Sequence, residues 1–114
     1  MQRVRLTDRD VADFGSQGVT ASPHARVGAV KGAAVDVVTF KPGAVLGRHP
    51  TRLWQLFSVV HGAGWACGAD GVRVQVVAGD CVLWEPEEDH ESGSDDGMVV
   101  VVVQTPSPPL PDIV

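Results

Sequence analysis

The sequence is poor in several features that would each have indicated a class of protein. It has only two cysteines, Cys67 and Cys81, which are too few for a disulfide framework and lack the Cys-x-x-Cys spacing. We therefore expect both to be small buried residues in a reducing compartment. Only nine residues are Lys or Arg, these are not clustered, and the formal net charge is −5. This balance argues against nucleic acid and against an anionic membrane surface as partners.

Long apolar runs are also absent. The longest, Met98 to Val103, has the length of a strand and falls far short of the roughly 18 residues that a membrane-spanning helix needs. The first ten residues contain no apolar signal core, so we expect a cytoplasmic protein. These absences set aside several classes of protein but do not indicate an activity.

What is present is valine. The chain has 22 valines in 114 residues, together with 13 glycines and 8 prolines. Branched side chains such as valine favour strands, whereas glycine and proline interrupt helices. A hydrophobic fraction of 44% with 20% charged residues excludes wholesale disorder, and the length suits a single domain. The composition therefore predicts one all-β domain.

Short strand-like runs alternate with turn signals along the chain. Strands are expected at residues 19–27, 33–40, 55–60, 65–68, 72–77, 81–84 and 98–104. Turns are expected at 41–43, 61–64, 69–71 and 78–80, an acidic loop at 85–91, and a helical turn at 8–14. This regular spacing is typical of a β-sandwich or barrel. We divide the chain into an N-terminal arm with a short strand (1–26), a barrel (27–104) and a proline-rich tail (105–114).

Two spaced sets of residues carry more specific information. The first reads Gly-x5-His-x-Thr-x3-Gln-x6-Gly from Gly43 to Gly62, and the second, sixteen residues later, reads Gly-x5-Glu-x-Glu-x2-His-x3-Ser from Gly79 to Ser94. This double pattern resembles the cupin superfamily, whose motifs read Gly-x5-His-x-His-x3,4-Glu-x6-Gly and Gly-x5-Pro-x-Gly-x2-His-x3-Asn. The resemblance covers residues from about 33 to 104. It implies a jelly-roll barrel, also called a double-stranded β-helix, and a homodimer.

The resemblance also marks the positions that hold a metal ion in other members. Those members use two histidines and a glutamate from the first motif and one histidine from the second. Here His49 and His90 are retained, whereas Thr51 and Gln55 replace a histidine and the glutamate. A divalent metal such as Fe, Mn, Ni or Zn held by His49, His90 and Gln55 would have no anionic ligand, so its affinity should be low. Glu88, on the same strand face as His90, could supply a carboxylate; otherwise it is a solvated acid of the loop.

The same positions suit a hydrogen-bonding pocket. His49, Thr51, Gln55 and His90 offer donors and acceptors without a fixed charge. Strand alternation predicts that two aromatic residues, Phe57 and Trp84, face the same interior, with core packing as the alternative for Trp84. Two arginines, Arg48 and Arg52, flank His49 and could contact an anionic ligand at the barrel mouth; the alternative is surface placement.

Three functions remain open at this point. The first is a small-molecule-binding barrel with an eroded metal site and no cofactor. The second is a metal-dependent enzyme of dioxygenase, isomerase or cyclase type that uses His49 and His90. The third is a structural role as a dimeric barrel, with Leu56 and Val60 as outward apolar residues. Seven of the fourteen acidic residues lie between Glu85 and Asp96, in what is expected to be a solvated loop.

Overall fold

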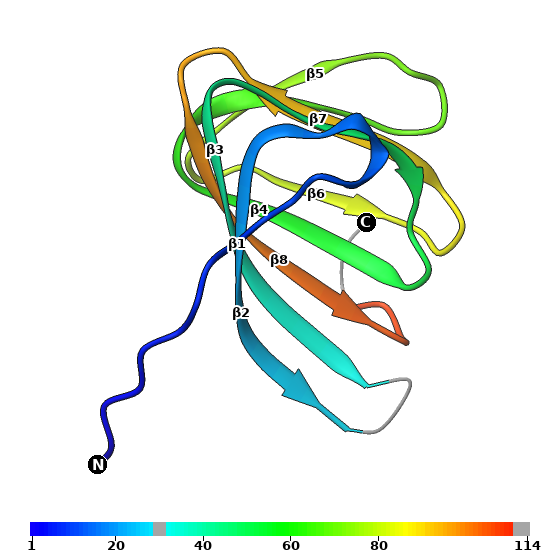
Figure 1. Ribbon diagram of the computed structural model, residues 1–114. Helices are drawn as coiled ribbons and strands as arrows, with labels where there is room; N and C mark the ends of the chain where they lie inside the picture. Colours follow the sequence, from blue (N-terminus) through cyan, green and yellow to red (C-terminus); the bar gives the residue numbers. More distant parts are fainter. Residues whose placement is uncertain (29–31, 111–114) are drawn as a thin grey trace.

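Strands make up most of the chain in a computed structural model that describes residues 1–28 and 32–110 (Figure 1). In chain order they are β1 (Arg9–Asp10), β2 (Gln17–Val27), β3 (Ala33–Pro50), β4 (Trp54–Cys67), β5 (Val74–Val77), β6 (Cys81–Trp84), β7 (Asp89–Ser94) and β8 (Met98–Thr105). One 3₁₀ turn, η1 (Asp13–Gly15), precedes β2. In the described residues no helix has the length and apolar character needed to cross a membrane.

Two long strands, β3 and β4, belong to both halves of the molecule. Residues 34–40 of β3 pair with β2 and β8, whereas residues 44–50 pair with β7. In the same way β4 pairs first with β6 and β8 and then, from residue 63, with β5 and β7. The result is two antiparallel layers, β2–β3–β8–β4–β6 and β3–β7–β4–β5, and Figure 1 shows β5 and β7 above β8 and β2. This arrangement confirms the predicted jelly-roll barrel.

Two of the predicted turns are wrong, because the strands continue through them. The turns expected at residues 41–43 and 61–64 lie where β3 and β4 cross from one layer to the other. Gly43 and Gly62 adopt φ values of +81° and +79°, which bend a strand without ending it. At Gly62 an added Cβ would collide with the carbonyl oxygen of Gly97. The glycines of the first motif therefore lie at fixed bends within the strands of the barrel rather than in loops.

Of the other predictions of local structure, some are confirmed and others are wrong. The strand at 81–84 is confirmed as β6, and the hairpin at 69–71 is confirmed, since β4 and β5 pair across it and Gly71 has a φ of +72°. The helical turn expected at 8–14 is wrong: residues 9–10 form β1, and only 13–15 are helical. The acidic loop is shorter than expected because β7 begins at Asp89, where it pairs with the end of β3.

Apolar side chains from both layers fill the barrel. The buried cluster comprises Val19, Ala21, Val38, Phe40, Ala44, Phe57, Val59, Ala66, Val76, Trp84, Met98, Val100 and Val102. Phe57 makes edge contacts with Phe40 and Trp84, with ring centroids 6.2 and 5.4 Å apart. Because this core is almost wholly apolar, the few buried polar side chains stand out.

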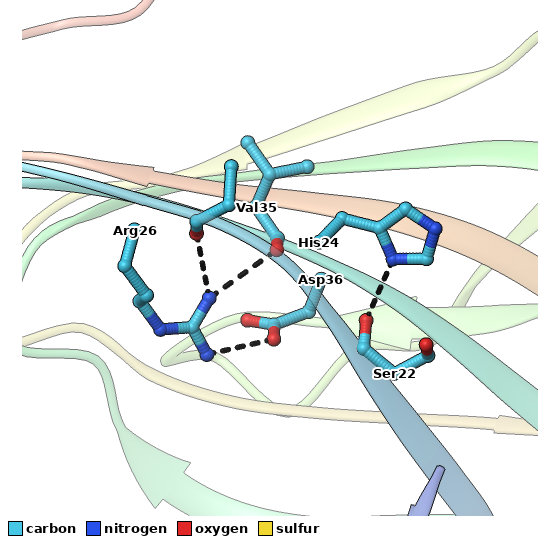
Figure 2. A network of polar contacts seen from close by, with 6 residues as sticks. Ser22, His24, Arg26, Val35 and Asp36 are labelled. Carbon is cyan, nitrogen blue, oxygen red and sulfur yellow. Dashed lines mark hydrogen bonds and ion pairs between the residues drawn. The ribbon is translucent and has the colours of Figure 1, made fainter. Parts of the chain in front are cut away.

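One buried polar group is a carboxylate held between two neighbouring strands. Asp36 of β3 lies 2.8 Å from a guanidinium nitrogen of Arg26 on β2. The other terminal nitrogen of Arg26 donates to the carbonyl oxygens of Ala25 and Val35 at 2.8 and 3.2 Å, as Figure 2 shows. The Asp36 side chain is 12% exposed and that of Arg26 54%, so the arginine neutralises the carboxylate from the solvent side.

Candidate functional site

The pairing of β3 with β7 brings together the histidines of the two motifs. His49 lies directly opposite His90, and their ring centroids are 4.4 Å apart. The His90 ring also lies 4.4 Å from the ring of Trp84 and is only 1% exposed. A register shift between Leu46 and His49 sets this alignment. His90 is therefore enclosed by a second imidazole and an indole.

Backbone carbonyls determine which nitrogen of each imidazole carries a proton. Nδ1 of His49 lies 2.6 Å from the carbonyl oxygen of Gly47, and Nδ1 of His90 lies 3.4 Å from that of Glu88. Since a carbonyl only accepts, Nδ1 donates in both rings, and in the neutral form of each ring Nε2 keeps its lone pair. Burial, and next the proximity of His49, lower the pKa of His90 from 6.5 to about 4. His90 is thus neutral at pH 7, and its buried Nε2 has no hydrogen-bond partner.

The other groups considered for a metal site make hydrogen bonds to the backbone. The Thr51 hydroxyl donates to the carbonyl oxygen of Leu53 at 2.7 Å. A carboxylate oxygen of Glu88 accepts from the backbone nitrogen of Glu85 at 3.1 Å. In residues 1–28 and 32–110 no three His, Cys, Asp or Glu side chains are grouped to hold a metal ion. Two imidazoles and the neutral amide of Gln55 do not fit a resident divalent cation.

A cavity of about 370 Å³ opens beside His49 at the end of the barrel. We call it the mouth cavity. It is lined by Phe14, His49, Pro50, Thr51, Arg52, Gln55 and Gln104. His49 belongs to one layer, whereas Gln55 and Gln104 are cross-strand neighbours in the other layer. The mouth cavity therefore lies between the two layers and includes three of the predicted pocket residues.

The other three predicted pocket residues lie elsewhere. Phe57 is 1% exposed and belongs to the core, and His90 lies behind His49. Trp84 lines a second and larger cavity, of about 780 Å³, between β5 and β6. The sequence grouped all six residues in one pocket, but the barrel distributes them over a mouth, a core and a side cavity.

The two arginines beside His49 have different surroundings. Arg48 donates to the carbonyl oxygens of Gly68 and Ala69 at 3.3 and 3.0 Å, and it lies 3.9 Å from Asp89. Arg52 lines the mouth cavity, and no described carboxylate lies within ion-pair distance of it. Of the two, Arg52 is the cation that a ligand in the mouth cavity can contact.

Sequence reasoning missed three residues of the mouth cavity, Phe14, Pro50 and Gln104, of which Phe14 contacts His49. Its ring stacks on His49 with centroids 4.1 Å apart and an interplanar angle of 8°, although the residue is 58% exposed. Its φ of +60° is strained for a residue with a side chain. The turn is held in place because Ser16 Oγ accepts a hydrogen bond from Gly47 N at 2.9 Å. A signal was present, since Phe14 is the only aromatic residue before Phe40.

Comparisons with known proteins agree with this architecture. No family model matches the sequence. Over 57 residues the chain is 39% identical to (R)-mandelonitrile lyase of Granulicella tundricola, a match that covers 50% of this chain and 44% of the lyase. The chain therefore spans less than half the length of this curated relative in the alignment.

Solved structures match over most of the chain. A cupin-like protein from Thermotoga maritima has a TM-score of 0.79 at 23% identity, with 93% of this chain and 82% of that chain covered. KdgF from Halomonas sp. has a TM-score of 0.74 at 20% identity, covering 89% and 88%. The polyketide cyclase RemF from Streptomyces resistomycificus has a TM-score of 0.78 at 17% identity, covering 96% and 82%. At these identities the likeness shows a shared fold.

Proposed function

We propose that this chain, which has the cupin fold that its two motifs predicted, binds a small organic acid in the mouth cavity without a metal. The observation that carries the proposal is the position of Arg52 in a cavity that also contains His49 and Gln55. Small-molecule sites are typically cavities of roughly 300–1,000 Å³ with a few convergent polar groups. The volume of about 370 Å³ suits a ligand of modest size.

Each polar group of the mouth cavity has a role in this proposal. The guanidinium of Arg52 binds a carboxylate through two parallel hydrogen bonds. Nε2 of His49 accepts a hydrogen bond from a hydroxyl group of the ligand, because its Nδ1 is bonded to the Gly47 carbonyl. The exposed ring of Phe14 packs against a flat organic body. Together these groups favour an acid that carries a hydroxyl group beside the carboxylate.

Calorimetric titration with (R)-mandelate and with its neutral amide tests this proposal. We expect the acid to bind more tightly than the amide, and Arg52→Gln to weaken binding of the acid roughly tenfold. Arg48→Gln is the matched control and should leave the affinity unchanged, because Arg48 contacts the carbonyls of Gly68 and Ala69. Equal affinity for acid and amide, or an Arg52→Gln variant that binds like the wild type, would refute the proposal.

A separate experiment tests whether the mouth cavity binds its ligand without a metal ion. Protein incubated with excess Fe²⁺, Mn²⁺, Ni²⁺ or Zn²⁺ and then desalted should retain well under one equivalent, because the donor set lacks an anion. Replacing His49 and His90 by alanine should then leave the amount of retained metal almost unchanged. A full equivalent of metal in the wild type that is lost in this double variant would overturn the metal-free site.

A second candidate is catalysis, favoured by the partial match to a lyase. This candidate is a metal-dependent reaction that uses His49 and His90, and the lack of an anionic ligand beside them weighs against it. The test is cleavage of (R)-mandelonitrile to benzaldehyde and hydrogen cyanide, followed by the absorbance of benzaldehyde with each metal present. Turnover that disappears in His49→Ala would establish this function. A rate equal to that of buffer with every metal would rule out this substrate.

A further inference from the structure

Large apolar side chains that are exposed gather at two separate places on the described chain. Six of them lie either in the first eight residues or in β5 and the turn before it: Met1, Val4, Leu6, Val72, Val74 and Val77. Each of the six is at least 43% exposed. Single exposed apolar residues are ordinary, but groups of them mark interaction surfaces. Each of the two groups is therefore a candidate surface for contact with a partner.

Residues 1–8 form a segment outside the barrel, which we call the N-terminal segment. They belong to no strand, every one of them is exposed, and Figure 1 shows them leading away from the rest of the chain. Basic and apolar residues alternate here, in the order Arg3, Val4, Arg5 and Leu6. In an extended chain this alternation places the two apolar side chains on one face and the two arginines on the other. The N-terminal segment therefore has the pattern of a strand whose apolar face is uncovered.

The side cavity of about 780 Å³ lies between two strands that each have a free edge. In the described residues both β5 and β6 pair with β4 alone. A free edge presents unpaired backbone groups, and proteins usually protect it with charged residues or proline. β5 contains neither, because its sequence is Val-Gln-Val-Val. The free edge of β5 can therefore accept a further strand.

The lining of the side cavity combines an apolar wall with acidic side chains. The exposed Val72 and Val74 belong to this lining, together with the buried Val76 of the core. The charged side chains of the lining are all acidic, namely Asp70, Asp80 and Glu88. No described lysine or arginine forms an ion pair with any of these three carboxylates. The cavity thus matches the N-terminal segment in apolar character and has the opposite charge.

We propose that the N-terminal segment of one copy of this chain docks in the side cavity of a second copy, as an added strand beside β5. Val4 and Leu6 then face the apolar wall of the cavity. The long side chains of Arg3 and Arg5 reach the carboxylates of the lining. Charge complementarity selects this occupant, because the segment carries two cations and the lining carries only anions. The docking surface is separate from the mouth cavity, so Arg52→Gln should leave the self-association unchanged.

The direction and length of the N-terminal segment favour a second copy over the same chain. In Figure 1 the segment runs to the lower left, whereas β5 lies at the top of the view. Fully extended, residues 1–8 span at most about 29 Å, and the four residues of β5 span about 13 Å. Half of the segment therefore covers the edge of β5, and the other half crosses between two molecules. Donor and acceptor are different surfaces, so each copy can use both at once.

Sedimentation velocity of the full chain tests the donor surface. The wild type should self-associate as its concentration rises to about 0.1 mM, and added salt should weaken this association. The double variant Arg3→Gln, Arg5→Gln should weaken it roughly tenfold, because two exposed ion pairs are lost. The double variant Arg9→Gln, Lys41→Gln removes the same charge outside the N-terminal segment and should associate as the wild type does. A wild type that stays monomeric over this range would overturn the proposal.

Val74→Lys tests the acceptor surface. Val74 is 59% exposed, so a lysine fits there without disturbing the core, while its charge protects the edge of β5 and repels the arginines of the segment. Self-association should fall roughly tenfold. Val60→Lys is the matched control, since Val60 is 53% exposed on β4 and is not part of the cavity lining. Loss of association in Val60→Lys with none in Val74→Lys would overturn the proposal and place the contact on the outer face of β4.

A mixture of the two weakened proteins gives a result that damage to the fold cannot imitate. The Arg3→Gln, Arg5→Gln protein keeps its side cavity, and the Val74→Lys protein keeps its N-terminal segment. Mixed at a concentration where neither self-associates, they should form a one-to-one complex. NMR signals of the Val76 methyl groups in the first protein should then shift. No complex in the mixture would overturn the proposal, as would a complex whose shifts avoid the lining of the side cavity.

Discussion

His49 and His90 are paired across β3 and β7 with their rings 4.4 Å apart, and each uses Nδ1 to contact a backbone carbonyl. The two imidazoles therefore present equivalent nitrogens although they come from different motifs. They differ in burial, because His90 also lies under Trp84 whereas His49 lines a cavity.

The stability of the protein should fall as the pH decreases from about 6.5 to about 4. The pKa of His90 is about 4 in the folded state against 6.5 in the unfolded state, so between these values only the unfolded chain binds the proton. The stabilisation is complete above pH 6.5, declines on acidification and levels off below pH 4. It amounts to at most about 3 kcal/mol.

Urea unfolding at several pH values measures this effect against two variants. His90→Gln should lose this part of the pH dependence, whereas His24→Gln, which replaces an exposed histidine, should retain it. Parallel pH profiles for the wild type and His90→Gln would show that His90 is not held neutral by burial.

Gly47→Ala should detach the turn that carries Phe14. A Cβ at Gly47 would collide with the carbonyl oxygen of Phe14, which is backbone and cannot move aside. We expect a loss of about 2 kcal/mol or more and faster amide exchange at Ser16. Gly71→Ala is the control, since a Cβ there meets open space and only the φ of +72° opposes it, at about 1 kcal/mol. Equal effects of both substitutions would contradict the packing of this turn on β3.

Thr51→His should create metal binding where the wild type has little. It places a third imidazole at the position that the motif resemblance assigns to a histidine, beside His49 and Gln55. We expect the affinity for Ni²⁺ or Zn²⁺ to rise by about two orders of magnitude, measured by competition with a chromophoric chelator. Thr51→Ser keeps the hydroxyl and should behave as the wild type. No gain in Thr51→His would mean that His49 and His90 cannot act together as ligands.

Arg26→Leu should destabilise the protein more than Asp36→Asn. Removing the arginine leaves the 12%-exposed carboxylate of Asp36 without its cation, at a cost of about 1–3 kcal/mol. Asp36→Asn removes the charge itself and leaves a partly exposed arginine that water can solvate. The double variant should be more stable than the sum of the two losses predicts. Additive losses in urea unfolding would show that the pair in Figure 2 contributes no coupling.

Much of the fold was predictable because strand signals are local. The strand at 81–84 and the hairpin at 69–71 follow from valine-rich runs and an Asp-Gly turn, and both are confirmed. The turns at 41–43 and 61–64 were predicted wrongly for a related reason. A glycine with positive φ ends a strand in one context and bends it in another, and only pairing with β7 and β8 keeps these strands continuous.

The candidate site was likewise predicted only in part. The motif spacing predicted the juxtaposition of His49 with His90, and the mouth cavity also contains Thr51 and Gln55. Phe14 was missed because its contact with His49 joins segments that are distant in sequence, through the bond between Ser16 and Gly47. The difference between Arg48 and Arg52 likewise depends on which carbonyls and carboxylates the fold places beside them.

The sequence by itself determined the all-β architecture, the cupin barrel and the positions of the two histidines, because strand propensity and motif spacing are properties of a linear chain. The tertiary structure alone decided that Trp84 lines a side cavity, that Phe57 lies in the core and that Ser92 Oγ lacks a partner. The reason is physical. Whether a side chain is solvated, paired or enclosed depends on the strand that lies opposite it, and the bends of β3 and β4 at Gly43 and Gly62 determine that strand.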